Sequence, residues 1–156
     1  MTAPLFSARA AVRSIESANV EQPAMPHFTL QYSANLETQV DMAKVVDVVR
    51  KAADKTGIFP LGGIRVRALR CEHYAIGDGN PDFAFLDMLL RLGEGRDLAT
   101  RKAAGEYIFR ALSAYLDPVF AKHKLALSFD MQINDKETSW KRNNIHDALK
   151  AEAAHG

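Results

Sequence analysis

The sequence is poor in the features that mark several large classes of protein. It has one cysteine, Cys71, in 156 residues, so it forms no disulfide within the chain and holds no multi-cysteine zinc site. Its 20 lysines and arginines are matched by 19 aspartates and glutamates, and no basic stripe with interleaved aromatics suits nucleic acid. No run reaches the ~18 apolar residues that a membrane span needs. We therefore expect a cytoplasmic protein that binds neither nucleic acid nor a membrane.

The first part of the chain lacks the regular apolar pattern of the rest. Residues 1–24 contain no apolar stretch long enough for a secretory signal, and two glutamates interrupt an organelle-targeting pattern. We expect an N-terminal extension over residues 1–24, either disordered or added by an upstream start codon, and a single domain over residues 25–156. If translation starts at Met25 and the methionine is removed, Pro26 becomes an N-terminal secondary amine, which can act as a base.

Hydrophobic periodicity beyond the extension predicts a repeated strand-helix-strand unit. The predicted strands are 27–32, 64–68, 83–90 and 125–133, and the predicted helices are 37–55, one that follows Asp97 as its cap, and a tail helix over 140–150. This order indicates an α+β fold, a tandem β-α-β repeat with both main helices on one face of a four-stranded sheet. The apolar sides of Phe28, Tyr32 and the last strand predict that other subunits cover the sheet.

Two polar clusters fail as metal sites. Asp78, Asn80 and Asp82 have the spacing of the first ligands of a calcium loop, but the positions of its glycine and final glutamate are apolar here. Residues 71–73 combine Cys, Glu and His without a second ligand pair at suitable spacing. We therefore expect no metal and no cofactor.

Five segments resemble, in order and spacing, 5-carboxymethyl-2-hydroxymuconate isomerase of the tautomerase superfamily. They are Met-Pro-His-Phe at 25–28, Thr-Gly-Ile-Phe-Pro-Leu-Gly-Gly-Ile-Arg at 56–65, Gly-Glu-Gly-Arg-Asp at 93–97, Leu-Ala-Leu-Ser-Phe at 125–129, and Asn-Asn-Ile-His at 143–146. The resemblance covers residue 25 to about residue 150. The departure is the extension, because the catalytic proline of that family is the mature N-terminus.

The resemblance implies a tautomerase-like domain, a homotrimer and a cofactor-independent isomerase. Enzymes of this family convert 5-carboxymethyl-2-hydroxymuconate to its conjugated 2-oxo isomer, an enol-to-ketone change with a double-bond shift, in bacterial homoprotocatechuate breakdown. The expected partner is therefore a small carboxylated dienol.

This chemistry needs one base that moves a proton and several cations that hold carboxylates and stabilise enolate charge. By the resemblance, Pro26 is the acid/base, and Arg65 and Arg96 are substrate-binding or electrophilic residues, whose guanidinium groups can take a carboxylate bidentately. Arg67, two residues along the same strand face from Arg65, either extends this cationic pocket or is a plain surface charge. Burial and nearby guanidinium groups are expected to lower the pKa of the proline nitrogen and leave free base near neutral pH.

Two other functions stay open at this point. A related proline-dependent enzyme would hydrate or dehalogenate an unsaturated acid with a protonated proline as the acid. A chain that keeps its extension would instead be a non-catalytic module that binds an acidic ligand through its arginines. The mass of the natively made protein separates these cases, because a polypeptide that begins at Pro26 supports an enzyme.

Overall fold

The computed structural model describes residues 25–156, so the predictions made for residues 1–24 lie outside the described residues. The described chain builds one four-stranded sheet from β1 (His27–Ser33), β2 (Arg65–Cys71), β3 (Phe83–Gly93) and β4 (Lys124–Asn134), in the spatial order β2-β1-β3-β4. β1 pairs parallel with β2 and β3 pairs parallel with β4, whereas the central pair β1 and β3 is antiparallel. This confirms the predicted tandem repeat.

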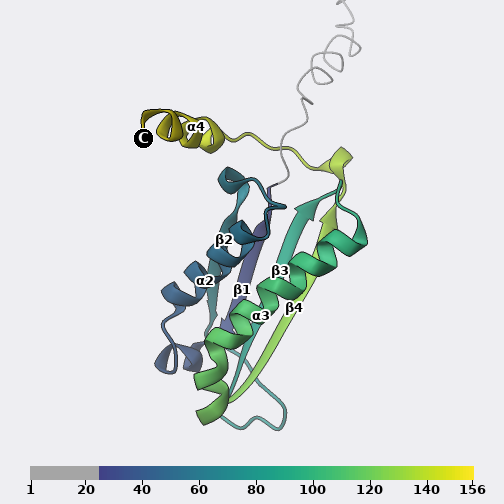
Figure 1. Ribbon diagram of the computed structural model, residues 1–156. Helices are drawn as coiled ribbons and strands as arrows, with labels where there is room; N and C mark the ends of the chain where they lie inside the picture. The colour runs from purple at the N-terminus through teal and green to yellow at the C-terminus, as the bar shows by residue number, and fades with distance from the viewer. Residues whose placement is uncertain (1–24) are drawn as a thin grey trace, which may run out of the picture.

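One helix connects the two strands of each parallel pair. α2 (Met42–Lys55) links β1 to β2, and α3 (Leu98–Lys122) links β3 to β4. Both helices lie side by side on the same face of the sheet (Figure 1). No helix within residues 25–156 is long and apolar enough to cross a membrane.

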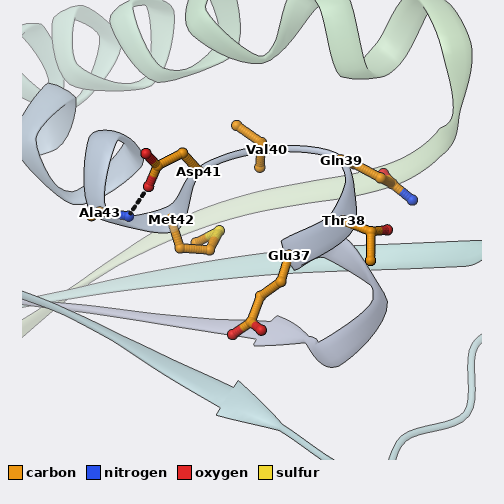
Figure 2. A pocket seen from close by; sticks show the side chains of 7 residues that line it. All are labelled: Glu37, Thr38, Gln39, Val40, Asp41, Met42 and Ala43. Carbon is orange, nitrogen blue, oxygen red and sulfur yellow. Dashed lines mark hydrogen bonds between the residues drawn. The ribbon is translucent and has the colours of Figure 1, made fainter.

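α2 begins later than the sequence pattern predicted. Residues Ala34–Thr38 form a short 3-10 turn, and the Asp41 carboxylate then accepts a hydrogen bond from the backbone N–H of Ala43 at 3.0 Å, which caps the helix (Figure 2). The predicted start at residue 37 is therefore wrong by one and a half turns. The helix begins after Asp41 because the aspartate side chain satisfies its first N–H groups.

α3 confirms the predicted cap and corrects one part of the predicted buried side. The Asp97 carboxylate accepts the N–H of Thr100 at 2.7 Å. Phe120, which the periodicity assigned to the buried side, is 41% exposed, whereas Leu116 is fully buried. Pro118 lies inside the helix near its end.

The core lies between the sheet and the two helices. The largest fully buried side chains are Phe28, Leu30, Leu36, Val45, Val49, Leu86, Met88, Leu90, Leu92, Ile108, Leu112 and Leu116. Alternate residues of the strands point into this layer, and the partly buried side chains Leu125, Leu127, Phe129 and Met131 of β4 pack against it as well. The expectation that other subunits must cover Phe28 and Tyr32 is wrong, because the helices of the same chain leave them 0% and 6% exposed.

The C-terminal tail crosses the end of the sheet at which β1 and β2 begin. It continues from β4 through a short turn, Lys136–Thr138, and ends in α4 (Ile145–His155), a helix that starts five residues later than the predicted 140. α4 contacts the turn Leu61–Gly63, which directly precedes β2, and otherwise projects from the domain (Figure 1). Trp140, ahead of the helix, is 80% exposed.

Candidate functional site

The strand pairing brings the predicted site residues to one end of the sheet. His27, at the start of β1, pairs with Arg65 at the start of β2 and with Arg91 near the end of β3. Because β3 runs antiparallel to β1, the segment that follows β3 returns to the same end. Pro26, Arg65 and Arg96 therefore share one region although they are separated in the sequence.

Pro26 is buried in this region. Its carbonyl oxygen accepts the backbone N–H of Arg65 at 3.1 Å, which extends the β1–β2 pairing by one residue. The preceding residue, Met25, is only 7% exposed. The Arg65 guanidinium Nη1 donates to the Gly63 carbonyl and lies 3.2 Å from the Met25 sulfur. A positive charge thus lies beside the residue that is bonded to the Pro26 nitrogen.

Arg96 is held against the apolar floor of the same region. Its Nε and Nη2 atoms donate to the Ile58 carbonyl at 2.9 and 2.6 Å, and its guanidinium carbon lies 5.3 Å from the centre of the Phe59 ring. The Phe59 ring meets Phe28 edge to face at 6.0 Å. Burial lowers the pKa of Arg96. Arg96 makes no ion pair with Asp97 and is fixed by the carbonyl instead.

Arg67 lies on the same strand as Arg65 but is set apart from Met25. It pairs with Thr29 of β1 and is exposed, and its side chain makes no hydrogen bond within the described residues. Its charge still acts on this face of the sheet, because it is one of the groups that lower the pKa of His27. Arg67 is therefore an exposed cation of this face, two residues further along β2 than Arg65.

His27 is a polar residue of this region that the sequence did not single out. Its pKa is lowered, first by burial and then by the charges of Arg65, Arg91, Arg67 and Lys141. Its Nδ1 atom is buried and has no hydrogen-bond partner among residues 25–156. A neutral imidazole is the form that such a cationic setting favours.

Asn143, in the C-terminal tail, is a second residue of this region that was not predicted as a site residue. Its Nδ2 atom donates to the Gly62 carbonyl at 2.9 Å and lies 3.5 Å from the Met25 sulfur, across 118 positions of sequence. His146 follows one turn later and packs on Gly62, where an added Cβ would meet its Nδ1 atom at 2.7 Å. The motif at 143–146 was visible in the sequence, but its contact with the turn before β2 was not.

The region is cationic and lacks acidic partners. Within residues 25–156, no carboxylate forms an ion pair with Arg65, Arg67, Arg91 or Arg96. The same residues contain no group of three or more His, Cys, Asp or Glu side chains placed to hold a metal ion. An anion is therefore the ligand that this end of the sheet is built to attract.

A hollow lined by Glu37–Ala43 lies away from this region (Figure 2). It follows the C-terminal end of β1, roughly 20 Å along the strand from Pro26. There the Tyr32 hydroxyl donates to Glu37, which raises the pKa of Tyr32 to about 12, and Arg70 pairs with the same carboxylate at 2.8 Å. Cys71, the last residue of β2, lies at this far end too. Tyr32, Glu37, Arg70 and Cys71 therefore lie outside the cationic region.

The sequence and the fold were compared with those of known proteins. A family profile described as 5-carboxymethyl-2-hydroxymuconate isomerase matches residues 26–149. A 5-carboxymethyl-2-hydroxymuconate Delta-isomerase of Escherichia coli is 34% identical over 126 residues, which are 81% of this chain and 100% of the relative.

Solved structures agree with the sequence matches. A crystal structure of a 5-carboxymethyl-2-hydroxymuconate delta-isomerase has a TM-score of 0.77 and 32% identity, and covers 84% of this chain and 97% of its own. The isomerase from Deinococcus radiodurans R1 has a TM-score of 0.76 and 33% identity, with 84% and 98% covered. A structure described as a fused 4-OT asymmetric trimer, at a TM-score of 0.52 and 17% identity over 78% of this chain and 98% of its own, shares the fold alone.

Proposed function

Because the chain belongs to the 5-carboxymethyl-2-hydroxymuconate isomerase family, which is a family of enzymes, we propose that it ketonises 5-carboxymethyl-2-hydroxymuconate with Pro26 as acid and base. The observation that carries this proposal is the contact between the Arg65 guanidinium and Met25. It means that release of Met25 would leave the Pro26 nitrogen beside a fixed positive charge, in a buried setting. The family profile also begins its match at residue 26.

The proposed reaction conserves all atoms. The free imino nitrogen of Pro26 takes the proton of the substrate enol, and the electrons of the O–H bond form the carbonyl. The conjugated double bonds then shift, and the ring nitrogen returns the proton to the carbon at the far end of the dienol. Arg65 and Arg96 hold carboxylates and stabilise the negative charge that develops on the oxygen.

The position of Pro26 favours the free base that this reaction needs. An α-amino group titrates near ~8, and burial together with a neighbouring guanidinium disfavours its protonated form. Pro26 is buried, its carbonyl accepts the backbone N–H of Arg65, and the Arg65 guanidinium contacts the side chain of the preceding residue, Met25. A lowered pKa leaves more of the nitrogen as the free base that takes the proton, and makes its protonated form a better acid for the return of that proton.

The other two functions are not favoured. Membership of an isomerase family speaks against a non-catalytic ligand-binding module and against a hydratase or dehalogenase. We further propose a cytoplasmic homotrimer that acts in homoprotocatechuate breakdown. The cationic face of the sheet, over which no helix of residues 25–156 lies, supports assembly, since a second copy would enclose the region around Pro26.

The experiment compares two forms of the protein, each verified by intact mass. One begins at Pro26 after translation from Met25, and the other keeps residues 1–25. Ultraviolet absorbance follows the conversion of the dienol to its conjugated ketone. We expect at least about a hundredfold higher turnover for the form with a free imino nitrogen. Equal turnover by a chain whose Pro26 nitrogen is still in a peptide bond would refute the mechanism.

A further inference from the structure

Two side-chain nitrogens from distant parts of the chain converge on the Met25 sulfur. Arg65 Nη1, at the start of β2, lies 3.2 Å from the Sδ atom, and Asn143 Nδ2, in the C-terminal tail, lies 3.5 Å from it. Met25 is the residue whose removal would free the Pro26 nitrogen. The two donors therefore mark the space next to that nitrogen.

Each of these nitrogens carries two hydrogens, and each nitrogen donates one hydrogen to a carbonyl of the turn Leu61–Gly63. Arg65 Nη1 donates to the Gly63 carbonyl at 3.2 Å, and Asn143 Nδ2 donates to the Gly62 carbonyl at 2.9 Å. The second hydrogen of each nitrogen points to the sulfur of Met25, which is a weak acceptor. Two oriented donors thus meet at an atom that satisfies them poorly.

The orientation of the Asn143 amide is set by its own partners. Its Oδ1 atom accepts the backbone N–H of Ile145 at 2.8 Å, and its nitrogen faces the Gly62 carbonyl. Exchange of the two amide atoms would place oxygen against oxygen and N–H against N–H. The N–H group that faces Met25 is therefore held in place before any ligand arrives.

We propose that Asn143 is a substrate-binding residue which, together with Arg65, takes one carboxylate oxygen in the space that Met25 fills. This inference rests on the proposed function, because it needs Met25 to be released from Pro26. A carboxylate oxygen accepts several hydrogen bonds and carries a negative charge, and Arg65 forms no ion pair within residues 25–156. Its binding would replace a thioether with a charged acceptor at both donors.

The surroundings suit this anion. Lys141, two residues before Asn143 in the tail, is among the charges that lower the pKa of His27, as are Arg91 and Arg65. The tail thus adds both an amide and a cation to the end of the sheet. The same geometry makes Met25 an obstacle, because in a chain that keeps it the sulfur occupies the carboxylate position.

The test measures binding of a charged probe and its neutral match. Adipate and adipamide have the same carbon skeleton, and the two carboxylates of adipate are amides in adipamide. Their dissociation constants are measured by NMR titration on the form that begins at Pro26, which keeps the whole segment matched by the family profile.

The variant is Asn143→Asp, which keeps an oxygen for the Ile145 N–H and replaces the N–H donor with a negative charge. The matched control is Asn144→Asp, at an exposed neighbour whose side chain makes no capping hydrogen bond.

We expect Asn143→Asp to lower the preference for adipate over adipamide at least about tenfold relative to Asn144→Asp, since it places like charges together. A tail that is merely loosened would weaken both probes alike and leave this preference unchanged, and that result would overturn the inference. The chain that keeps residues 1–25 should bind adipate more weakly than the form that begins at Pro26. Pro26→Ala in the latter form separates the two proposals, because it should retain adipate binding while it loses turnover.

Discussion

The Nη1 atom of Arg65 lies 3.2 Å from the sulfur of Met25, a residue 40 positions earlier in the sequence. Through this contact the start of β2 is linked to the segment just before β1, and a permanent cation comes to lie at the residue bonded to the Pro26 nitrogen. Parallel pairing of the two strands is what produces it, since His27 and Arg65 are direct partners. The consequences of this arrangement can be measured.

Pro26→Ala should abolish most of the ketonisation and leave the fold intact. In the form that begins at this position, the substitution replaces a ring-held secondary amine with a primary amine that rotates freely. We expect a fall in turnover of about 10²–10⁴-fold, with unchanged far-ultraviolet circular dichroism. Pro81→Ala, in the turn before β3, serves as the control and should retain activity. Wild-type turnover by Pro26→Ala would remove the mechanism.

Arg96→Ala should weaken both substrate binding and stability. The guanidinium spends two N–H groups on the Ile58 carbonyl and lies over Phe59, so its loss leaves a carbonyl unpaired. We expect a higher KM in steady-state kinetics and a loss of about 1–3 kcal/mol in the free energy of unfolding. Arg96→Lys keeps the charge but loses the pair of N–H donors that hold the Ile58 carbonyl. Its KM and its stability should therefore lie between those of the wild type and those of Arg96→Ala. Arg110→Ala, at an exposed position of α3, is the control; an unaltered KM and kcat in Arg96→Ala would exclude a role in substrate binding.

The lowered pKa of His27 predicts a pH dependence of stability. Below its unfolded pKa of about 6.5, the unfolded chain binds this proton more readily than the folded chain does, so the folded state loses stability as the pH falls. Above that pH the contribution is constant. We expect the melting temperature to drop between pH 7.5 and 5.5 by more in the wild type than in His27→Gln. His73→Gln, at an exposed histidine after β2, should leave the drop unchanged, and a drop as large in His27→Gln would contradict the assignment.

Gly62→Ala should loosen the C-terminal tail. The added methyl group would lie 2.7 Å from the His146 ring, and α4 must shift to relieve the clash. Overpacking of this kind costs about 1–3 kcal/mol. Limited proteolysis of the tail and thermal unfolding report it. The double variant Gly62→Ala/His146→Ala should lose less stability than the sum of the two single changes, and strict additivity would show that the two residues do not interact.

The sequence predicted those parts of the fold that depend on neighbours along the chain. Asp97 was identified as a cap because aspartate before an apolar-periodic segment satisfies the first N–H groups of a helix. The same rule applied at Asp41 would have given the start of α2, but the helix was predicted to begin at Glu37 instead. Phe120 was wrongly assigned to the buried side for a related reason. Periodicity shows which face of a helix is apolar, but it does not show how far along that face the packing sheet extends.

The candidate site was predicted only in part. Pro26, Arg65 and Arg96 were identified because short segments around them resemble those of a known family, and the structure brings them to one end of the sheet. His27 and Asn143 were not identified as site residues. The alternation of β1 shows only that His27 points away from Phe28, and no local pattern reveals that Asn143 reaches a turn 81 positions earlier.

By itself, then, the sequence determined the order of strands and helices, one of the helix caps and the family, because these depend on periodicity and on short motifs that act over a few residues. Only the tertiary structure decided which charges gather around Pro26. Pairing of β1 with β2 and β3 brings Arg65 and Arg91 to His27, and the tail adds Asn143 and Lys141. The electrostatics of the site depend on distances between these residues, and those distances exist only once the sheet has formed.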